Sequence, residues 1–181
     1  MNWQEAAQQL AQNKIGILPT DTLYGIVGSA LNPDAVEHIY KVKHRDTTKP
    51  CIVLISAIED LNQFKIDLSK DLKAKLVEFW QKPTSVIISC AGPEFDYLHR
   101  GTHAIAFRIP NKPNLLELLK VSGPLIAPSC NPESQPPALT IEQAKNYFGN
   151  EVDFYLDEGE LNNPPSKVIQ INLDGTVTAF R

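Results

Sequence analysis

The sequence predicts an α/β (α+β) protein, in which an open, twisted, mixed sheet with flanking helices forms a single domain over residues 1–181. Strand-like apolar segments alternate with helical patterns along the chain, which is typical of a sheet with helices between its strands. No repeat, low-complexity tract or linker divides the 181 residues, a length that suits one domain. Asp174-Gly175 lies between two strand-like segments and predicts a terminal hairpin, so the sheet is expected to contain antiparallel as well as parallel pairs.

Capping residues mark the starts of the predicted helices. A Ser, Thr or Asn side chain can accept from a free backbone N–H of the first turn, and proline suits the first helical position. The predicted helix starts are Asn2 with Glu5, Asn32-Pro33, Ser69, Pro113 (with a helix to about Val121), and Thr140 with Gln143 (with a helix to Phe148). In the helix that Ser69 opens, the apolar spacing predicts one buried face, formed by Leu72, Leu76, Phe79 and Trp80.

Short apolar runs predict the strands between these helices. The predicted strands are residues 14–19, Cys51–Ser56, Thr84–Ser89, Ala104–Ile109, Pro124–Ala127, Val152–Leu156, Lys167–Leu173 and Thr176–Phe180.

Composition narrows the function classes. Seventeen Lys and Arg against 21 Asp and Glu give a net charge of −4. This charge argues against a protein whose main role is to bind nucleic acid, although it is compatible with a local basic patch. Three cysteines without a C-x-x-C pair argue against a disulfide framework and against a cysteine zinc site. No apolar run reaches the roughly 20 residues of a membrane helix, and no signal-peptide pattern opens the chain. We therefore expect a cytoplasmic protein without membrane contact.

Three loops carry polar or charged side chains that can contact a ligand. The first is Pro19–Gly25, directly after a predicted strand. It offers the hydroxyls of Thr20 and Thr22, the phenol of Tyr24, and a glycine that lets the chain turn closely around a small ligand. A threonine-rich turn with Tyr24 packed in the core explains the same residues equally well.

The second loop, Lys41–Pro50, joins a helix to a strand and is strongly basic. Lys43, Arg45 and Lys49 alternate in a way that suits a polyphosphate, since Arg makes two-pronged contacts and Lys acts as a point charge. The alternative is a solvated basic helix end, where cations complement the helix dipole.

The third loop, Ala127–Pro132, follows another predicted strand. Ser129 and Asn131 are two residues apart, so in an extended stretch both side chains face one side, where the amide of Asn131 can read a base or ribose edge. A turn closed by the side chain of Asn131 accounts for the pattern as well.

The order and spacing of these motifs carry more information than any one of them. The chain reads PTDTLYG at 19–25, K-x-R at 43–45 followed by Lys49-Pro50, A-I-A-F-R-I-P around Arg108, and P-S-x-N at 128–131. This ordered set resembles the YrdC-like family of threonylcarbamoyl-AMP synthases, from the first helix to Arg181. The resemblance implies a YrdC-like fold as a single domain without the family's common C-terminal extension. It also implies an enzyme, a nucleotidyltransferase, that makes the activated group for threonylcarbamoyladenosine in tRNA from L-threonine, bicarbonate and ATP.

The resemblance also implies a role for each matching residue. Lys43 and Arg45 match the catalytic K-x-R that holds the ATP phosphates. The implied ATP-binding residues are Arg45, Lys49, Ser129, Asn131 and Arg181. The implied threonine-binding residues are Thr20, Thr22, Tyr24, Arg108, Ala127 through its backbone, and Ser166. No protein-held metal is implied, and Mg²⁺ is expected to arrive with ATP.

Some positions depart from the family pattern. The family's S-A-N-x-S-G is here Ser129-Cys130-Asn131-Pro132-Glu133-Ser134, so the closing glycine is missing, and Leu54 stands where some members carry a histidine. Two alternatives therefore remain: a double-stranded RNA-binding protein, and a nucleotide-binding paralogue without synthase activity. The partners implied by the main interpretation are tRNA or double-stranded RNA and the downstream proteins that transfer threonylcarbamoyl to tRNA.

Overall fold

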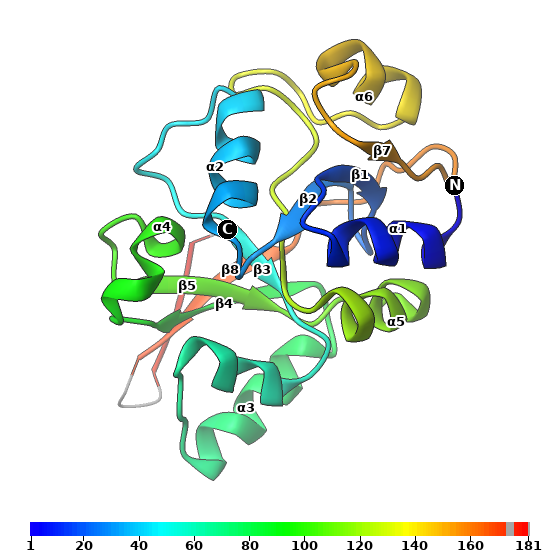
Figure 1. Cartoon of the computed structure of the whole chain (residues 1–181). Coiled ribbons are helices and arrows are strands. Elements are labelled where there is room, and N and C mark those ends of the chain that lie inside the picture. Colours follow the sequence, from blue (N-terminus) through cyan, green and yellow to red (C-terminus); the bar gives the residue numbers. More distant parts are fainter. Residues whose placement is uncertain (173–175, 181) are drawn as a thin grey trace.

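The computed structural model describes residues 1–172 and 176–180. Within them, nine strands form one sheet in the order β7-β1-β2-β6-β3-β5-β4-β8-β9, with helices packed around it (Figure 1). The strands are β1 (Gly16–Pro19), β2 (Tyr24–Ser29), β3 (Ile52–Leu54), β4 (Thr84–Ser89), β5 (Ala104–Arg108), β6 (Leu125–Ile126), β7 (Phe154–Tyr155), β8 (Lys167–Ile171) and β9 (Val177–Ala179). The α-helices are α1 (Trp3–Ala11), α2 (Pro33–Val42), α3 (Lys70–Trp80), α4 (Asp96–His99), α5 (Pro113–Ser122) and α6 (Ile141–Phe148). The 3₁₀ segments are η1 (Ile58–Phe64) and η2 (Pro93–Phe95).

The predicted mixed sheet is confirmed by the strand pairing. β1 with β7, β3 with β5, and β4 with β8 are parallel, whereas the other neighbours run antiparallel. β8 and β9 pair as the predicted hairpin, with Ile169 opposite Ala179. The turn residues predicted for that hairpin, Asp174 and Gly175, lie outside the described residues.

The capping residues predicted from the sequence begin the helices as expected. The side chains of Asn2, Asn32 and Ser69 accept from backbone N–H groups of the first turns of α1, α2 and α3, and Asn2 with Glu5 completes a reciprocal capping box. At α6 only half of the predicted box forms. Thr140 accepts from the N–H of Gln143, but the Gln143 side chain accepts from the N–H of Leu139 instead of Thr140.

Two hydrophobic clusters form the core because successive strand residues face opposite sides of the sheet. In β1, Ile17 joins the larger cluster, with α2 and α3, whereas the next residue, Leu18, joins the smaller one. The smaller cluster packs under α1 and α5, which lie side by side in Figure 1. Packing on both faces of the sheet fixes its strands in place. The loops of the candidate site begin at the ends of these strands.

Some elements differ from the prediction. β2 was not predicted, because its two glycines are poor strand formers. It is nevertheless buried between β1 and β6 and pairs with both strands. On α3 only Leu76 and Trp80 are buried, whereas Leu72 and Phe79 are half-buried, so the predicted buried face is narrower. No helix in the described part of the chain has the length and apolar character needed to cross a membrane.

Candidate functional site

A cavity of about 790 Å³ lies where the loops after β1 and β6 meet the open face of β5 and β8. Its volume is in the range of small-molecule sites, roughly 300–1,000 Å³. It brings together eight residues predicted as site residues: Thr20, Thr22, Tyr24, Arg45, Arg108, Ala127, Ser129 and Ser166. Lys43, Lys49 and Asn131 do not line this cavity, and Arg181 lies outside the described residues.

The turn between β1 and β2 is built by Thr20. Its hydroxyl donates to the carbonyl of Leu23 at 2.7 Å and accepts from the N–H groups of Thr22 and Leu23. It also lies 3.1 Å from the hydroxyl of Thr22. Thr20 therefore shapes the loop, as the turn interpretation predicted, and leaves the side chain of Thr22 at the cavity wall.

Tyr24 is fully buried, and its hydroxyl ties the cavity wall to a later loop. The hydroxyl donates to the carbonyl of Gly159 at 2.7 Å and accepts from the N–H of Glu158 at 3.1 Å. Burial raises the pKa of this phenol above its ordinary value of 10.0. Tyr24 therefore packs in the core as one interpretation held, and it is also one of the residues that line the cavity.

Arg108 ends β5 with its side chain buried against the first loop. Its Nη2 lies 3.1 Å from Oδ1 of Asp21, and both side chains are about 5% exposed or less. Its Nη1 donates to the hydroxyl of Thr22 at 3.4 Å. A guanidinium held in this way at a cavity wall can receive a carboxylate from the ligand side.

Ser166 lines the cavity from the chain that leads into β8. The residue is buried, and its hydroxyl lies 3.0 Å from that of Ser85 on β4. This contact fixes the serine at the cavity wall.

Lys43 ends α2 but is only 2% exposed, so the solvated alternative does not hold for it. Its ammonium donates to the carbonyl of Ser129 at 2.5 Å and to that of Asn131. Burial, helped by the nearby charge of Arg45, lowers its pKa from 10.5 to about 8. Lys43 therefore holds the third loop by its backbone, and an ammonium with three donors keeps one more to offer.

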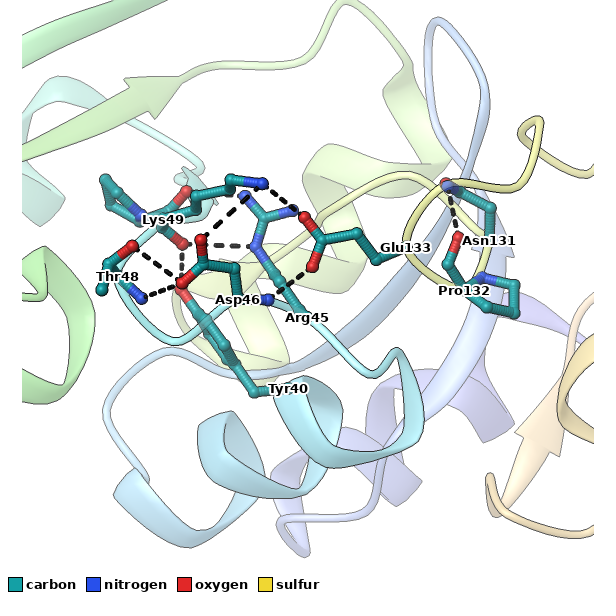
Figure 2. Close-up of polar contacts among 9 residues, drawn as sticks. Tyr40, Arg45, Asp46, Thr48, Lys49, Asn131, Pro132 and Glu133 are labelled. Carbon is teal, nitrogen blue, oxygen red and sulfur yellow. Dashed lines mark hydrogen bonds and ion pairs between the residues drawn. The ribbon is translucent and has the colours of Figure 1, made fainter.

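Arg45 lines the cavity. Its loop folds around Tyr40, as Figure 2 shows. Its guanidinium donates to the carbonyls of Lys49 and Pro50 and lies 5.8 Å from the centre of the Tyr40 ring. The Tyr40 hydroxyl donates to the same Lys49 carbonyl at 2.7 Å. These contacts fix the 45–50 loop while one edge of the Arg45 guanidinium remains for an anion.

Glu133, directly after the third loop, connects it to the second loop (Figure 2). One carboxylate oxygen lies 2.5 Å from the Lys49 ammonium, and the other accepts from the Asp46 N–H at 2.5 Å. The Glu133 N–H donates to the carbonyl of Lys43 at 2.8 Å. The ion pair with Lys49 lowers the pKa of Glu133, and Glu133 raises the pKa of Lys49. A lysine ammonium and a backbone N–H are also the donors that phosphate oxygens take in proteins.

The third loop is closed by the side chain of Asn131. Its amide donates to the carbonyls of Pro132 and Gln135, and its oxygen accepts from the Ser129 hydroxyl at 2.6 Å. Ser134 has a φ of +70°, in the left-handed region that favours glycine, at the place where the family pattern has its closing glycine. The loop thus keeps the glycine-type backbone without the glycine.

Four residues that support the site were not predicted: Asp21, Tyr40, Ser85 and Glu133. Asp21 lies inside PTDTLYG, so its place in the motif was the one available signal. Glu133 and Ser85 act through partners 84 and 81 residues away in the sequence, which no local pattern indicates. Among the described residues, no group of three or more His, Cys, Asp or Glu side chains is placed to hold a metal ion.

Comparison with known proteins gives matches over nearly the whole chain. The Sua5/YciO/YrdC family model, described as telomere recombination, matches residues 8–181. The threonylcarbamoyl-AMP synthase of Hahella chejuensis is 31% identical over 91% of this chain and 91% of its own length. That of Bacillus subtilis is 30% identical over 86% of this chain, which spans only 45% of the Bacillus protein.

Among solved structures, Sua5 of P. abyssi in complex with L-threonine superposes with a TM-score of 0.88 at 24% identity. The match covers 99% of this chain and 53% of that protein, so the two share the fold described above. With the cavity, the ordered motifs and the family match in agreement, we conclude that the chain belongs to the Sua5/YciO/YrdC family.

Proposed function

We propose that the protein is an L-threonylcarbamoyladenylate synthase, which condenses L-threonine, bicarbonate and ATP to threonylcarbamoyl-AMP and pyrophosphate. The observation that carries the proposal is that one cavity is lined both by Arg108 with Thr22, which suit an amino-acid carboxylate, and by Arg45 with Ser129, which suit a nucleotide. The name of the Hahella chejuensis relative, which this chain matches over 91% of both lengths, supports the same activity.

Threonine is assigned to the Arg108 end of the cavity. The guanidinium receives the substrate carboxylate. Thr22 and Ala127 line the same cavity, and the Thr22 hydroxyl and the Ala127 backbone are proposed to contact threonine there. Thr20 and Tyr24 support this wall through the turn and the 157–159 loop. Ser166, directly before β8, is proposed to contact threonine with its hydroxyl.

ATP is assigned to the cavity end formed by Arg45 and Ser129. Arg45 faces the phosphates, and Lys49 and the N–H of Asp46 form an anion site beside it that Glu133 fills in this structure. Lys43 and Asn131 hold the shape of the Ser129 loop, and Arg181 is proposed to reach the nucleotide. Mg²⁺ enters as part of the MgATP substrate and keeps several of its waters.

The reaction follows from these positions. The threonine amine adds to bicarbonate with loss of water to give a carbamate, whose oxygen attacks the α-phosphorus of ATP and expels pyrophosphate. This step needs no protein nucleophile. Catalysis depends on alignment of the carbamate with the α-phosphorus and on Arg45 stabilising the charge that develops on the phosphates. The activated product would pass to the proteins that transfer the threonylcarbamoyl group to tRNA.

The test is pyrophosphate release by the purified protein, with each substrate omitted in turn. We expect release when ATP, L-threonine and bicarbonate are all present, and loss of release when any one is absent. Equal release without threonine would overturn the assignment. Binding of an ATP analogue without any release would favour the inactive paralogue, and steeply salt-dependent binding to double-stranded RNA, again without release, would favour the RNA-binding alternative.

A further inference from the structure

Asp21 is a buried carboxylate that the proposed reaction does not use. Its side chain is 4% exposed, and it does not line the cavity, although its chain neighbours Thr20 and Thr22 do. One oxygen lies 3.1 Å from Nη2 of Arg108, and the other accepts from the N–H of Asn111 at 3.1 Å. Asp21 therefore pairs with Arg108 without itself forming part of the cavity wall.

This arrangement restricts the guanidinium of Arg108. One of its terminal nitrogens faces Asp21, and the other donates to Thr22. The backbone N–H of Asn111 holds the Asp21 carboxylate in turn, so the anion is itself fixed. A guanidinium is planar, and contacts with its nitrogens therefore set the orientation of the whole group.

Because the Arg108 guanidinium is buried, it needs the negative charge of Asp21. A guanidinium that is 5% exposed is costly without a counter-charge, and Asp21 supplies one. Without Asp21 the guanidinium would be free to turn toward other acceptors in the loop, and its geometry toward a ligand carboxylate would be lost.

We infer that Asp21 is a positioning residue, which aims the Arg108 guanidinium at the carboxylate of the amino-acid substrate. This inference rests on the proposed function, because Arg108 must receive that carboxylate. It assigns no contact between Asp21 and the substrate.

The experiment compares calorimetric binding of L-threonine with binding of L-threoninamide, which lacks the carboxylate charge. The wild-type protein should prefer threonine. In Asp21→Asn this preference should fall by about 10-fold or more, because the misaligned guanidinium no longer distinguishes the two ligands. Asp21→Glu, which keeps the charge but moves it outward, should give an intermediate preference. Affinity for a non-hydrolysable ATP analogue should stay unchanged in both variants.

Asp153→Asn is the matched control. Asp153 also accepts one backbone N–H, that of Ile15 at 2.9 Å, and pairs with one cation, Lys14, but away from the cavity. Its threonine preference should equal that of the wild type. The ligand preference is a ratio within the folded fraction, so partial unfolding of a variant does not change it.

A wild-type preference in Asp21→Asn would overturn the inference and leave the proposed function standing. If Asp21→Asn does not fold, Asp21→Glu decides in the same way, since an unmoved preference there refutes positioning. A wild-type protein without any preference for threonine would instead overturn the assignment of Arg108 itself, and the inference with it.

Discussion

Replacing the buried Lys43 by methionine tests how the third loop is held. Lys43→Met keeps a long side chain in place but removes the ammonium that donates to the carbonyls of Ser129 and Asn131. The lowering of the Lys43 pKa from 10.5 to about 8 corresponds to about 3 kcal/mol against the charged form in the folded protein. Lys43→Met removes this cost but leaves two carbonyls without their donor, at roughly 1–3 kcal/mol each, so the two effects oppose each other at pH 7.

We therefore expect Lys43→Met to change the free energy of unfolding at pH 7 by no more than about 3 kcal/mol. The dependence on pH is the sharper measurement. Below pH 8 the lysine is protonated in both states, whereas between pH 8 and 10.5 the unfolded chain binds a proton that the folded protein has released. The stability of the wild type thus rises with pH in this window, by about 2 kcal/mol between pH 8 and pH 10 relative to Lys43→Met.

Urea unfolding of both proteins at several pH values measures this difference, and groups that titrate in both proteins cancel. A difference that stays constant from pH 7 to 10 would mean that Lys43 has an ordinary pKa. A difference that falls with pH would mean that the carbonyl contacts raise its pKa. Either result would show that burial does not lower the pKa of Lys43.

Three further predictions concern the two loops shown in Figure 2. Arg45→Ala should lower the turnover number by roughly 10- to 1,000-fold in the pyrophosphate assay, because phosphate charge loses its stabilising group; unchanged turnover would exclude Arg45 from the site. Glu133→Gln should tighten the binding of an ATP analogue several-fold, as measured by calorimetry, because the carboxylate competes with phosphate for Lys49. As a control, Glu117→Gln on α5 removes the same charge elsewhere and should have no effect. Weaker binding in Glu133→Gln would show that Glu133 supports the nucleotide. Ser134→Gly should raise the free energy of unfolding by up to about 1 kcal/mol in urea titrations, because it relieves the left-handed backbone at φ +70°, and a loss of stability would contradict this.

The helices were predictable because their signals are local. Asn2, Asn32 and Ser69 cap helices within three or four residues of themselves, so their sequence neighbours suffice. β2 was not predictable in this way, because its glycines oppose strand formation and its stability comes from pairing with β1 and β6.

The residues that form the site were easier to predict from the sequence than the contacts among them. The ordered motifs indicated Thr22, Arg45 and Arg108, and the fold brings all three to one cavity. The burial of Lys43 could not be read from a loop with several cations, since it depends on carbonyls 86 and 88 residues away.

In the proposed reaction, this cavity joins threonine, bicarbonate and ATP in one product. The most direct measurement is mass spectrometry of the products formed from ¹³C-bicarbonate, L-threonine and ATP. We expect an AMP conjugate that contains one threonine and one ¹³C atom, formed together with pyrophosphate. AMP released without such a conjugate, or a conjugate that contains the labelled carbon but no threonine, would contradict it.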